Sequence, residues 1–266
     1  MLADLHLHTH FSDGLLSPAE LLTAVRAAGL NRWAVTDHDT VTACRLLRGE
    51  AGLIPGVEIT AGHEGREIHI VGLGVDCDHA GLEAFLQRNR VLRRQRLITL
   101  FSRLPASRRE GMELSEADDG ISESLGRLHL ARLLVAKGKV RSINDAFDRW
   151  LGDERRADHA LPAFPGLAET AQAIRAAGGV ALLAHPGLYG SVAAAAQLMA
   201  FDLDGLEVDH PGLGADRRDQ LVALATTNHW LMSAGSDLHF TGNRTPGAWN
   251  LTPTQWRPLL ERLKLL

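Results

Sequence analysis

Residues 4–14, DLHLHTHFSDG, carry several histidines and a carboxylate at the end of a short apolar run. The run at 2–7 predicts a β-strand, in which His6 and His8 share one face because side chains two positions apart point the same way. Both imidazoles can therefore reach one metal ion. Each part also has a simpler interpretation: a histidine on a strand can be a half-buried polar residue, and Asp13 in its glycine loop can belong to a turn.

Six further apolar runs predict strands, and most of them end in histidines or carboxylates. These expected strands cover residues 33–36, 54–59, 67–73, 180–184, 205–208 and 230–234. Helical patterns separate several of them. Ser17, Pro18 and Glu20 form a helix start with a capping box, and residues 167–177 and 221–227 predict further helices. Alternating strands and helices indicate parallel strands with helical crossovers.

A β/α barrel would explain why polar residues follow the strands. The C-terminal strand ends of such a barrel form one face, and residues distant in sequence would meet there. These residues are His6, His38, Glu58, His185 and Asp237. An open doubly wound sheet is the alternative, although it would spread the same residues along a line.

Residues 80–160 interrupt the alternation with long helical patterns at 82–101 and 127–137 and no clear strand. We predict a helical insert packed over the mouth of a barrel formed by residues 1–79 and 161–266. The insert holds 16 Lys and Arg against 12 Asp and Glu, whereas the rest of the chain holds 12 against 20. A basic insert suits an anionic ligand, and an acidic remainder suits cations.

Several classes of protein are excluded by what the sequence lacks. No apolar run approaches the roughly 20 residues that span a bilayer, and the first residues resemble no signal peptide, so we expect a cytoplasmic enzyme with no membrane partner. Cys44 and Cys77 are too few for a disulfide framework and lack metal-finger spacing. Neither an acyl-transfer motif nor a P-loop occurs.

The histidines and carboxylates together predict a metal centre. Four strand ends carry a histidine beside a carboxylate, and Glu58 and His69 lie on two further strands. Such mixed ligands suit Mn²⁺, Fe²⁺ or Zn²⁺ better than Ca²⁺. More than four ligands implies more than one ion.

The sequence resembles the PHP family, named for its polymerase and histidinol phosphatase members. The matching segments are DLHLHTHFSDG at 4–14, VTDHDT at 35–40, PGVEIT at 55–60, EIHIVGLG at 67–74, LLAHPG at 182–187, EVDHPG at 207–212 and GSDLH at 235–239. They follow the family's order and cover the chain apart from the insert. The resemblance implies a distorted (β/α)7 barrel with an inserted, mainly helical cap, and two to three divalent ions, with manganese as the expected metal and iron or zinc as alternatives.

The resemblance also implies nine metal ligands, arranged around three ions. The first ion would take His6, His8, Glu58 and Asp237. Glu58 would bridge to a second ion held by His69 and His185. The third ion would take Asp13, His38 and His239. Some family members have histidine at the position of Asp13.

Two segments of the insert, GRLHLAR at 126–132 and AFDRWLG at 146–152, resemble one branch of the family. Its members remove phosphate from nucleoside 3′,5′-bisphosphates or trim short RNA from the 5′ end. The residues expected to hold the second phosphate are Ser124, Arg127, His129 and Arg132. Arginine forks suit phosphate oxygens, and interhelix salt bridges are the alternative. The usual motif has proline where Leu128 stands, and tyrosine where this chain offers Asp158 or His159.

We therefore expect hydrolysis of the 3′-phosphate of a nucleoside 3′,5′-bisphosphate by metal-activated hydroxide. His210 would protonate the leaving group, or would instead orient a neighbouring ligand, as expected for Asp37 and Asp39. The alternatives are a 5′–3′ exoribonuclease on short RNA with the same metals, a histidinol-phosphatase-like enzyme, and a non-catalytic metal-binding module. No protein partner is evident from the sequence.

Overall fold

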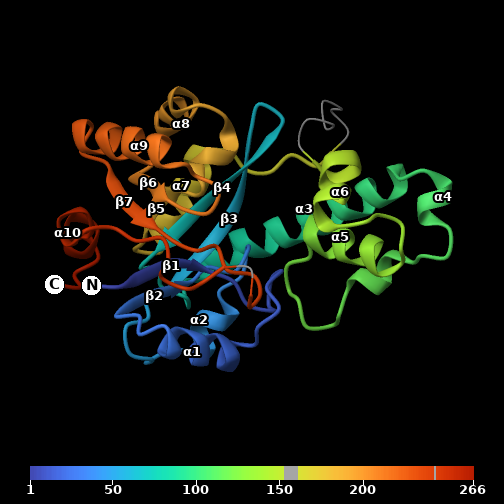
Figure 1. The fold of residues 1–266 in the computed structure, drawn as a ribbon, viewed down its shortest axis with the longest axis horizontal. Helices are drawn as coiled ribbons and strands as arrows, with labels where there is room; N and C mark the ends of the chain where they lie inside the picture. The colour runs from blue at the N-terminus through green and yellow to red at the C-terminus, as the bar shows by residue number, and fades with distance from the viewer. Residues whose placement is uncertain (153–160, 243) are drawn as a thin grey trace.

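The computed structural model describes residues 1–152, 161–242 and 244–266, which form a mixed α/β fold (Figure 1). The strands are β1 (Ala3–Leu7), β2 (Arg32–Val35), β3 (Gly56–His63), β4 (Arg66–Leu73), β5 (Val180–Leu183), β6 (Gly205–Asp209) and β7 (Leu231–Ala234). The α-helices are α1 (Pro18–Ala27), α2 (Thr42–Leu46), α3 (Ala80–Arg103), α4 (Ala106–Arg109), α5 (Arg127–Ala136), α6 (Ile143–Ala146), α7 (Leu167–Ala176), α8 (Val192–Met199), α9 (Ala215–Thr227) and α10 (Pro253–Arg262). Every strand predicted from the sequence is present, with ends shifted by a few residues.

The strands form two sheets. β1 and β2 pair in parallel, and the second sheet has the order β3-β4-β5-β6-β7. Isolated bridges connect the sheets at both edges, joining Trp33 to Leu53, His38 to Glu58 and Leu7 to Leu238. Across the described residues the ladders do not close into one barrel. The mixed α/β prediction is confirmed, whereas the (β/α)7 barrel with its cap is not.

The prediction that the strands are parallel is wrong for β4. This strand runs antiparallel to both β3 and β5. The connection from β3 is a tight turn, in which Glu64 and Gly65 both have positive φ angles, of 49° and 75°. Two residues with positive φ are typical of a type I′ hairpin, which is far too short for a helical crossover. The antiparallel pairing places His69 opposite Thr60 of β3.

Helix starts follow local capping chemistry. The predicted capping box is present in α1: Ser17 Oγ accepts from the Glu20 backbone N–H at 3.3 Å, and Glu20 accepts from the Ser17 N–H at 2.8 Å. The helices α2, α8 and α10 were not predicted from the sequence, nor were the short helices α4 and α6 within the insert. The start of α10 carries the same signal, because Thr252 and Gln255 form a reciprocal capping box.

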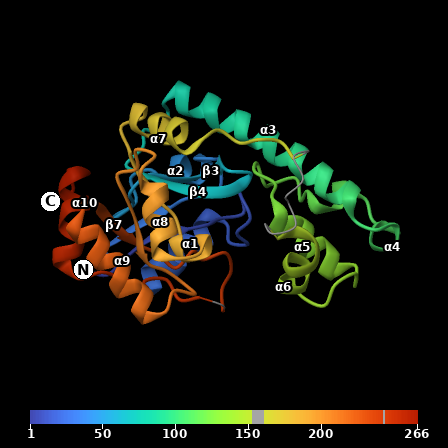
Figure 2. The same ribbon diagram turned by 90° about the horizontal axis from the view of Figure 1, so that it is seen from above.

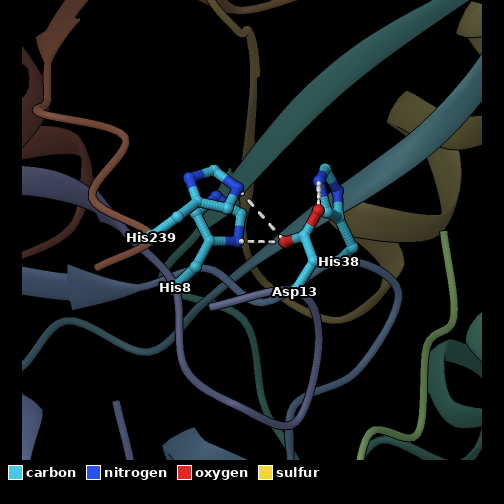
Figure 3. A group of neighbouring side chains, drawn as sticks. All are labelled: His8, Asp13, His38 and His239. Atoms are coloured by element: carbon cyan, nitrogen blue, oxygen red, sulfur yellow. Dashed lines mark ion pairs between the residues drawn. The ribbon is translucent and has the colours of Figure 1, made fainter. Parts of the chain in front are cut away.

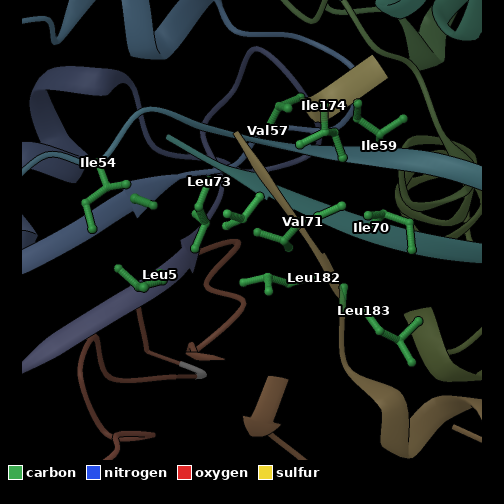
Figure 4. Packing of buried hydrophobic residues seen from close by; sticks show 14 of the residues in the cluster. Leu5, Ile54, Val57, Ile59, Ile70, Val71, Leu73, Ile174, Leu182 and Leu183 are labelled. Carbon is green, nitrogen blue, oxygen red and sulfur yellow. The ribbon is translucent and has the colours of Figure 1, made fainter. Parts of the chain in front are cut away.

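Apolar side chains pack in two separate clusters. The larger lies around the strands, where residues such as Leu5, Ile59 and Leu182 are almost fully buried (Figure 4). The smaller lies among the helices of the insert and includes Leu130 and Leu134. Fully burying one such side chain contributes about 1.5–3 kcal/mol.

Helix α3 belongs to both clusters. Its first half contributes Leu82 and Leu86 to the large core, and its second half contributes Leu97 and Leu100 to the small one. Figure 2 shows this helix running from the strands to α4, with α5 and α6 beneath its far end. No helix in the described part of the chain is long and apolar enough to cross a membrane.

Candidate metal centre

The structure brings all nine predicted ligands together. Glu58 of β3 lies at the centre, fully buried, and its two carboxylate oxygens face histidines on opposite sides. Oε2 lies 3.1 Å from His6 Nε2 and 3.3 Å from His8 Nε2. Oε1 lies 3.0 Å from His69 Nδ1 and 2.9 Å from His185 Nε2. A carboxylate shared in this way can bridge two ions.

Asp237 closes the first group of predicted ligands. Its Oδ1 lies 3.3 Å from His8 Nε2 and 3.7 Å from His6 Nε2. His6 and His8 are both fully buried, whereas the Asp237 side chain is 18% exposed. The group therefore opens toward solvent on the side of Asp237.

Asp13 lies at the centre of the third group of predicted ligands (Figure 3). Its carboxylate lies 3.1 Å from His239 Nε2, 3.7 Å from His38 Nε2 and 3.8 Å from His8 Nδ1. The ligand atoms of these four residues all lie within 4.8 Å of one another. His8 thus faces both this group and the first, one ring nitrogen toward each.

The geometry fits bound cations. Five buried atoms in the cluster have no hydrogen-bond partner among the described residues, although each faces another ligand atom. They are His6 Nε2, His8 Nε2, Asp13 Oδ1, His38 Nδ1 and His69 Nδ1. Buried polar atoms are almost always hydrogen-bonded, and metal ions bound among these groups would satisfy all five.

Other polar residues hold the ligands in place. Glu207 accepts from the His185 backbone N–H at 2.6 Å and lies 2.9 Å from His6 Nδ1, so it orients ligands from two strands. Asp37 accepts from the Thr9 backbone and from Ser12 Oγ. These contacts support the orienting role expected of Asp37.

Two predicted ligands occupy strained backbone. His185 and Asp237 have φ angles of 31° and 49°, in the left-handed region that non-glycine residues rarely adopt. Such residues cost about 1–3 kcal/mol each and cluster at functional sites. Gly235, just before this bend, lies so close to β1 that a Cβ atom there would be 2.4 Å from His6 Cβ. Glycine is therefore required to bring Asp237 against His6.

Electrostatics in the cluster follow its charges. Burial disfavours the ionised form of Glu58, yet His38, His6 and His69 hold its pKa well below the usual value. Burial likewise opposes protonation of His8, but Asp237 and Glu58 raise its pKa to about 10. In the metal-free protein, protons therefore occupy positions that cations would take.

Two of the predicted phosphate ligands have unsatisfied polar atoms. Ser124 is fully buried, and its hydroxyl has no hydrogen-bond partner in the described chain. Its backbone N–H donates to Phe11 O at 3.3 Å, close to Asp13 in sequence. Arg132 Nη2 is also buried and unpartnered within the described ranges. Burial lowers the pKa of Arg132 while Asp13 and Asp119 act to raise it.

The other two have partners. His129 Nδ1 accepts from the Gly126 backbone N–H at 3.0 Å, and burial lowers the pKa of His129. Arg127 Nη2 lies 2.9 Å from Glu67 Oε2, and its Nη1 donates to Leu151 O. Asp158 and His159 lie outside the described residues, as does the last part of the predicted insert.

His210 lies behind His185, with ring centroids 6.4 Å apart. Its Nε2 accepts from the Gly187 backbone N–H at 3.3 Å, and its Nδ1 donates to Pro211 O at 2.9 Å. Burial lowers its pKa. These contacts suit a residue that orients the turn after His185. The role of His210 as proton donor to the leaving group stays a prediction.

Sequence reasoning missed several residues of the site. Glu207 and Glu67 each contact a predicted ligand histidine, and Arg244 pairs with Asp237 Oδ2 at 2.7 Å. The two glutamates lie inside segments that match the family, and each stands two residues before a histidine or an aspartate. This spacing could have identified them from the sequence. Nothing in the sequence indicates Arg244.

Two arginines of α3 are buried against the strands. Arg93 and Arg96 are each 3% exposed. Arg93 donates to Thr60 Oγ1 at 2.7 Å, and Arg96 pairs with Glu67. The basic charge of α3 is thus partly directed at the strands.

The chain is similar to several known proteins. The PHP domain model matches residues 4–151. A 5′-3′ exoribonuclease of Haemophilus influenzae is 36% identical, with 89% of each chain covered. A 3′,5′-nucleoside bisphosphate phosphatase of Chromobacterium violaceum is 28% identical, with 98% of this chain and 96% of that protein covered. A structure from Bifidobacterium adolescentis, assigned as a metal-dependent phosphoesterase, matches with a TM-score of 0.82 and 28% identity over 98% of this chain and 96% of that chain.

Proposed function

This chain belongs to the PHP domain family of metal-dependent phosphoesterases, and we propose that it removes the 3′-phosphate of nucleoside 3′,5′-bisphosphates. The nine clustered histidines and carboxylates would hold two to three divalent ions, with Mn²⁺ as the proposed metal. Bound there, the ions would acidify a water and neutralise phosphate oxygens as charge develops. Metal analysis of protein purified without chelators distinguishes manganese from iron and zinc.

One observation carries the choice of substrate. Ser124 Oγ and Arg132 Nη2 are buried polar atoms without partners among the described residues, beside the loop that holds Asp13. Leaving such groups unsatisfied is costly, and a phosphate oxygen would satisfy both. A second phosphate bound by the insert would favour a bisphosphate over a monophosphate, because the monophosphate leaves the arginine unpaired.

The chain's own residues would divide the remaining work. Glu207 keeps His6 and His185 oriented toward Glu58. His210, through Gly187, holds the turn that follows His185. Nδ1 of His129 is paired with Gly126, so its other ring nitrogen would face the second phosphate. Arg127, which pairs with Glu67, would add positive charge beside this phosphate.

The larger architecture belongs to the same proposal. The bridges at both sheet edges support an interrupted seven-stranded barrel. The separate apolar cluster among α3, α5 and α6 supports the division at residues 80–160. In this arrangement the insert supplies substrate contacts and the strands supply metal ligands.

The test is a comparison of substrates. Protein loaded with Mn²⁺ is assayed for phosphate release from adenosine 3′,5′-bisphosphate, AMP and histidinol phosphate. We expect the bisphosphate to give the highest kcat/KM. Rapid turnover of histidinol phosphate alone would refute the proposed substrate.

A 5′-3′ exoribonuclease is the second candidate, favoured by the 36% identical relative of that activity. The same Ser124 and Arg132 could then hold the 5′-phosphate of a short RNA. A 5′-phosphorylated oligoribonucleotide labelled at its 3′ end distinguishes the two. Stepwise shortening from the 5′ end, at a higher kcat/KM than the bisphosphate, would favour the exoribonuclease.

A further inference from the structure

Glu67 contacts a predicted metal ligand from the side away from the cluster. It lies on β4 two residues before His69, so the two side chains share one face of the strand. Glu67 Oε1 is 2.8 Å from His69 Nε2, and the Glu67 side chain is only 3% exposed. The other ring nitrogen of His69, Nδ1, faces Glu58 at 3.0 Å. The carboxylate therefore keeps the N–H on Nε2 and the lone pair of Nδ1 toward the cluster.

The second oxygen of Glu67 faces the insert. Arg96 of α3 and Arg127, the first residue of α5, both pair with Oε2, the latter at 2.9 Å. Both guanidinium groups also lie over aromatic rings, at 5.0 Å from the centroid of Phe164 and 5.5 Å from that of Phe147. The arginines are thus held by packing as well as by charge.

We propose that Glu67 is a positioning residue through which the helical insert orients the metal ligand His69. The chain of contacts runs from Arg127 and Arg96 through the Glu67 carboxylate to the His69 ring. Helix α5 also carries His129 and Arg132. The same helix therefore places the proposed phosphate site and, through Arg127 and Glu67, orients a metal ligand. This inference rests on the metal centre of the proposed function, but it does not depend on which phosphoester is cleaved.

A purely structural role for Glu67 is the competing explanation. A buried carboxylate between two arginines could simply fasten the insert to the strands, with His69 a neighbour only. Removing it would then lower the stability of the metal-free protein and leave metal affinity unchanged. Metal affinity measured without substrate separates the two roles.

The first experiment compares Mn²⁺ binding to wild type and to Glu67→Gln by calorimetry and by the electron paramagnetic resonance of free Mn²⁺. We expect at least one ion to bind about tenfold or more weakly, the range typical of residues that orient a ligand. Glu169→Gln is the matched control, since Glu169 pairs with Arg88 at 2.5 Å on the exposed surface. Unchanged Mn²⁺ affinity in Glu67→Gln would overturn the proposal.

The second experiment tests the contribution of the insert. Arg127→Gln keeps the Glu67–His69 contact and removes one of the positive charges that the described residues place against the Glu67 carboxylate. We expect a severalfold loss of Mn²⁺ affinity in the absence of any nucleotide. If Arg127→Gln instead raises only the KM for the bisphosphate, Arg127 is a substrate contact and the relay from the insert is wrong.

Folding and metal binding are measured separately from hydrolysis. Thermal unfolding in EDTA reports folding directly, and if Glu67→Gln does not fold, Arg127→Gln carries the test alone. If wild type binds Mn²⁺ but hydrolyses no nucleotide, the proposed substrate fails while the affinities still decide the role of Glu67.

Discussion

The strand region and the insert both present polar atoms without hydrogen-bond partners, but in different arrangements. In the strand region the five such atoms of the cluster face one another around Glu58 and Asp13. In the insert, Ser124 Oγ and Arg132 Nη2 face no opposite charge within hydrogen-bond distance among the described residues. The first arrangement suits shared cations, and the second suits the phosphate of the proposed substrate. The comparison separates the metal-binding role from the recognition role.

Loss of a cluster ligand should have the largest effect. We expect His6→Ala to lower kcat by about a thousandfold or more with every substrate, beyond the 10–100-fold typical of residues that only orient a ligand. Initial rates at saturating Mn²⁺ measure this. His63→Ala, a substitution outside the cluster, is the control, and retention of more than a tenth of the activity by His6→Ala would mean that His6 is not a ligand.

Metal removal should destabilise the strand region more than the insert. At a Mn²⁺ concentration about a thousandfold above Kd, binding stabilises the folded state by about 4 kcal/mol, which corresponds to about 10 °C in Tm for a chain of this size. Scanning calorimetry with and without EDTA measures the total. Hydrogen exchange should show the larger change at β1 and β3 and the smaller one at α5; the reverse order would place the cations elsewhere.

Arg132→Gln should act on recognition alone. A hydrogen bond to a charged group contributes about 1.5–3 kcal/mol, so we expect the KM for the bisphosphate to rise about 10–100-fold with kcat little changed. Steady-state kinetics on the bisphosphate and on AMP measure this, and Mn²⁺ affinity is the control. An equal loss with both substrates would show that Arg132 supports the fold rather than the second phosphate.

The smallest expected effect is on the pH dependence of stability in metal-free protein. Against the effect of burial, Asp237 and Glu58 raise the pKa of His8 to about 10, and Glu58 and Glu67 raise that of His69 to about 9. Both values exceed the ordinary value of about 6.5, so protonation stabilises the fold fully below about pH 6.5, and this contribution is lost as pH rises toward 9–10.

Urea unfolding in EDTA from about pH 6.5 to about pH 9.5 should therefore show falling stability. With Mn²⁺ the trend should be opposite over the lower part of this range, because cations bind deprotonated ligands. The same trend with and without Mn²⁺ would contradict the assignment of these histidines to the metal centre.

The convergence of the nine ligands could be predicted because most of them lie in short segments at or just after strand ends, and Glu58 and His69 lie on the strands β3 and β4 themselves. The direction of β4 was not predicted. The general alternation of strands and helices favoured a parallel strand and outweighed the local signal of the two-residue turn at Glu64 and Gly65. The partners of His69 depend on that direction together with the packing of α3. For this reason the roles of Glu67 and of Arg127 emerge only from the structure.

Helix α3 has 24 residues and is therefore about 36 Å long. Because its two halves lie in different apolar cores, neither core can unfold without disrupting part of the same helix. Without the insert, the second half of α3 would lose its packing, and the helix would fray toward Leu82 and Leu86. Without the strand region, the first half would fray toward Leu97 and Leu100. The two regions are thus linked through this helix, and part of any stabilisation of one is passed to the other.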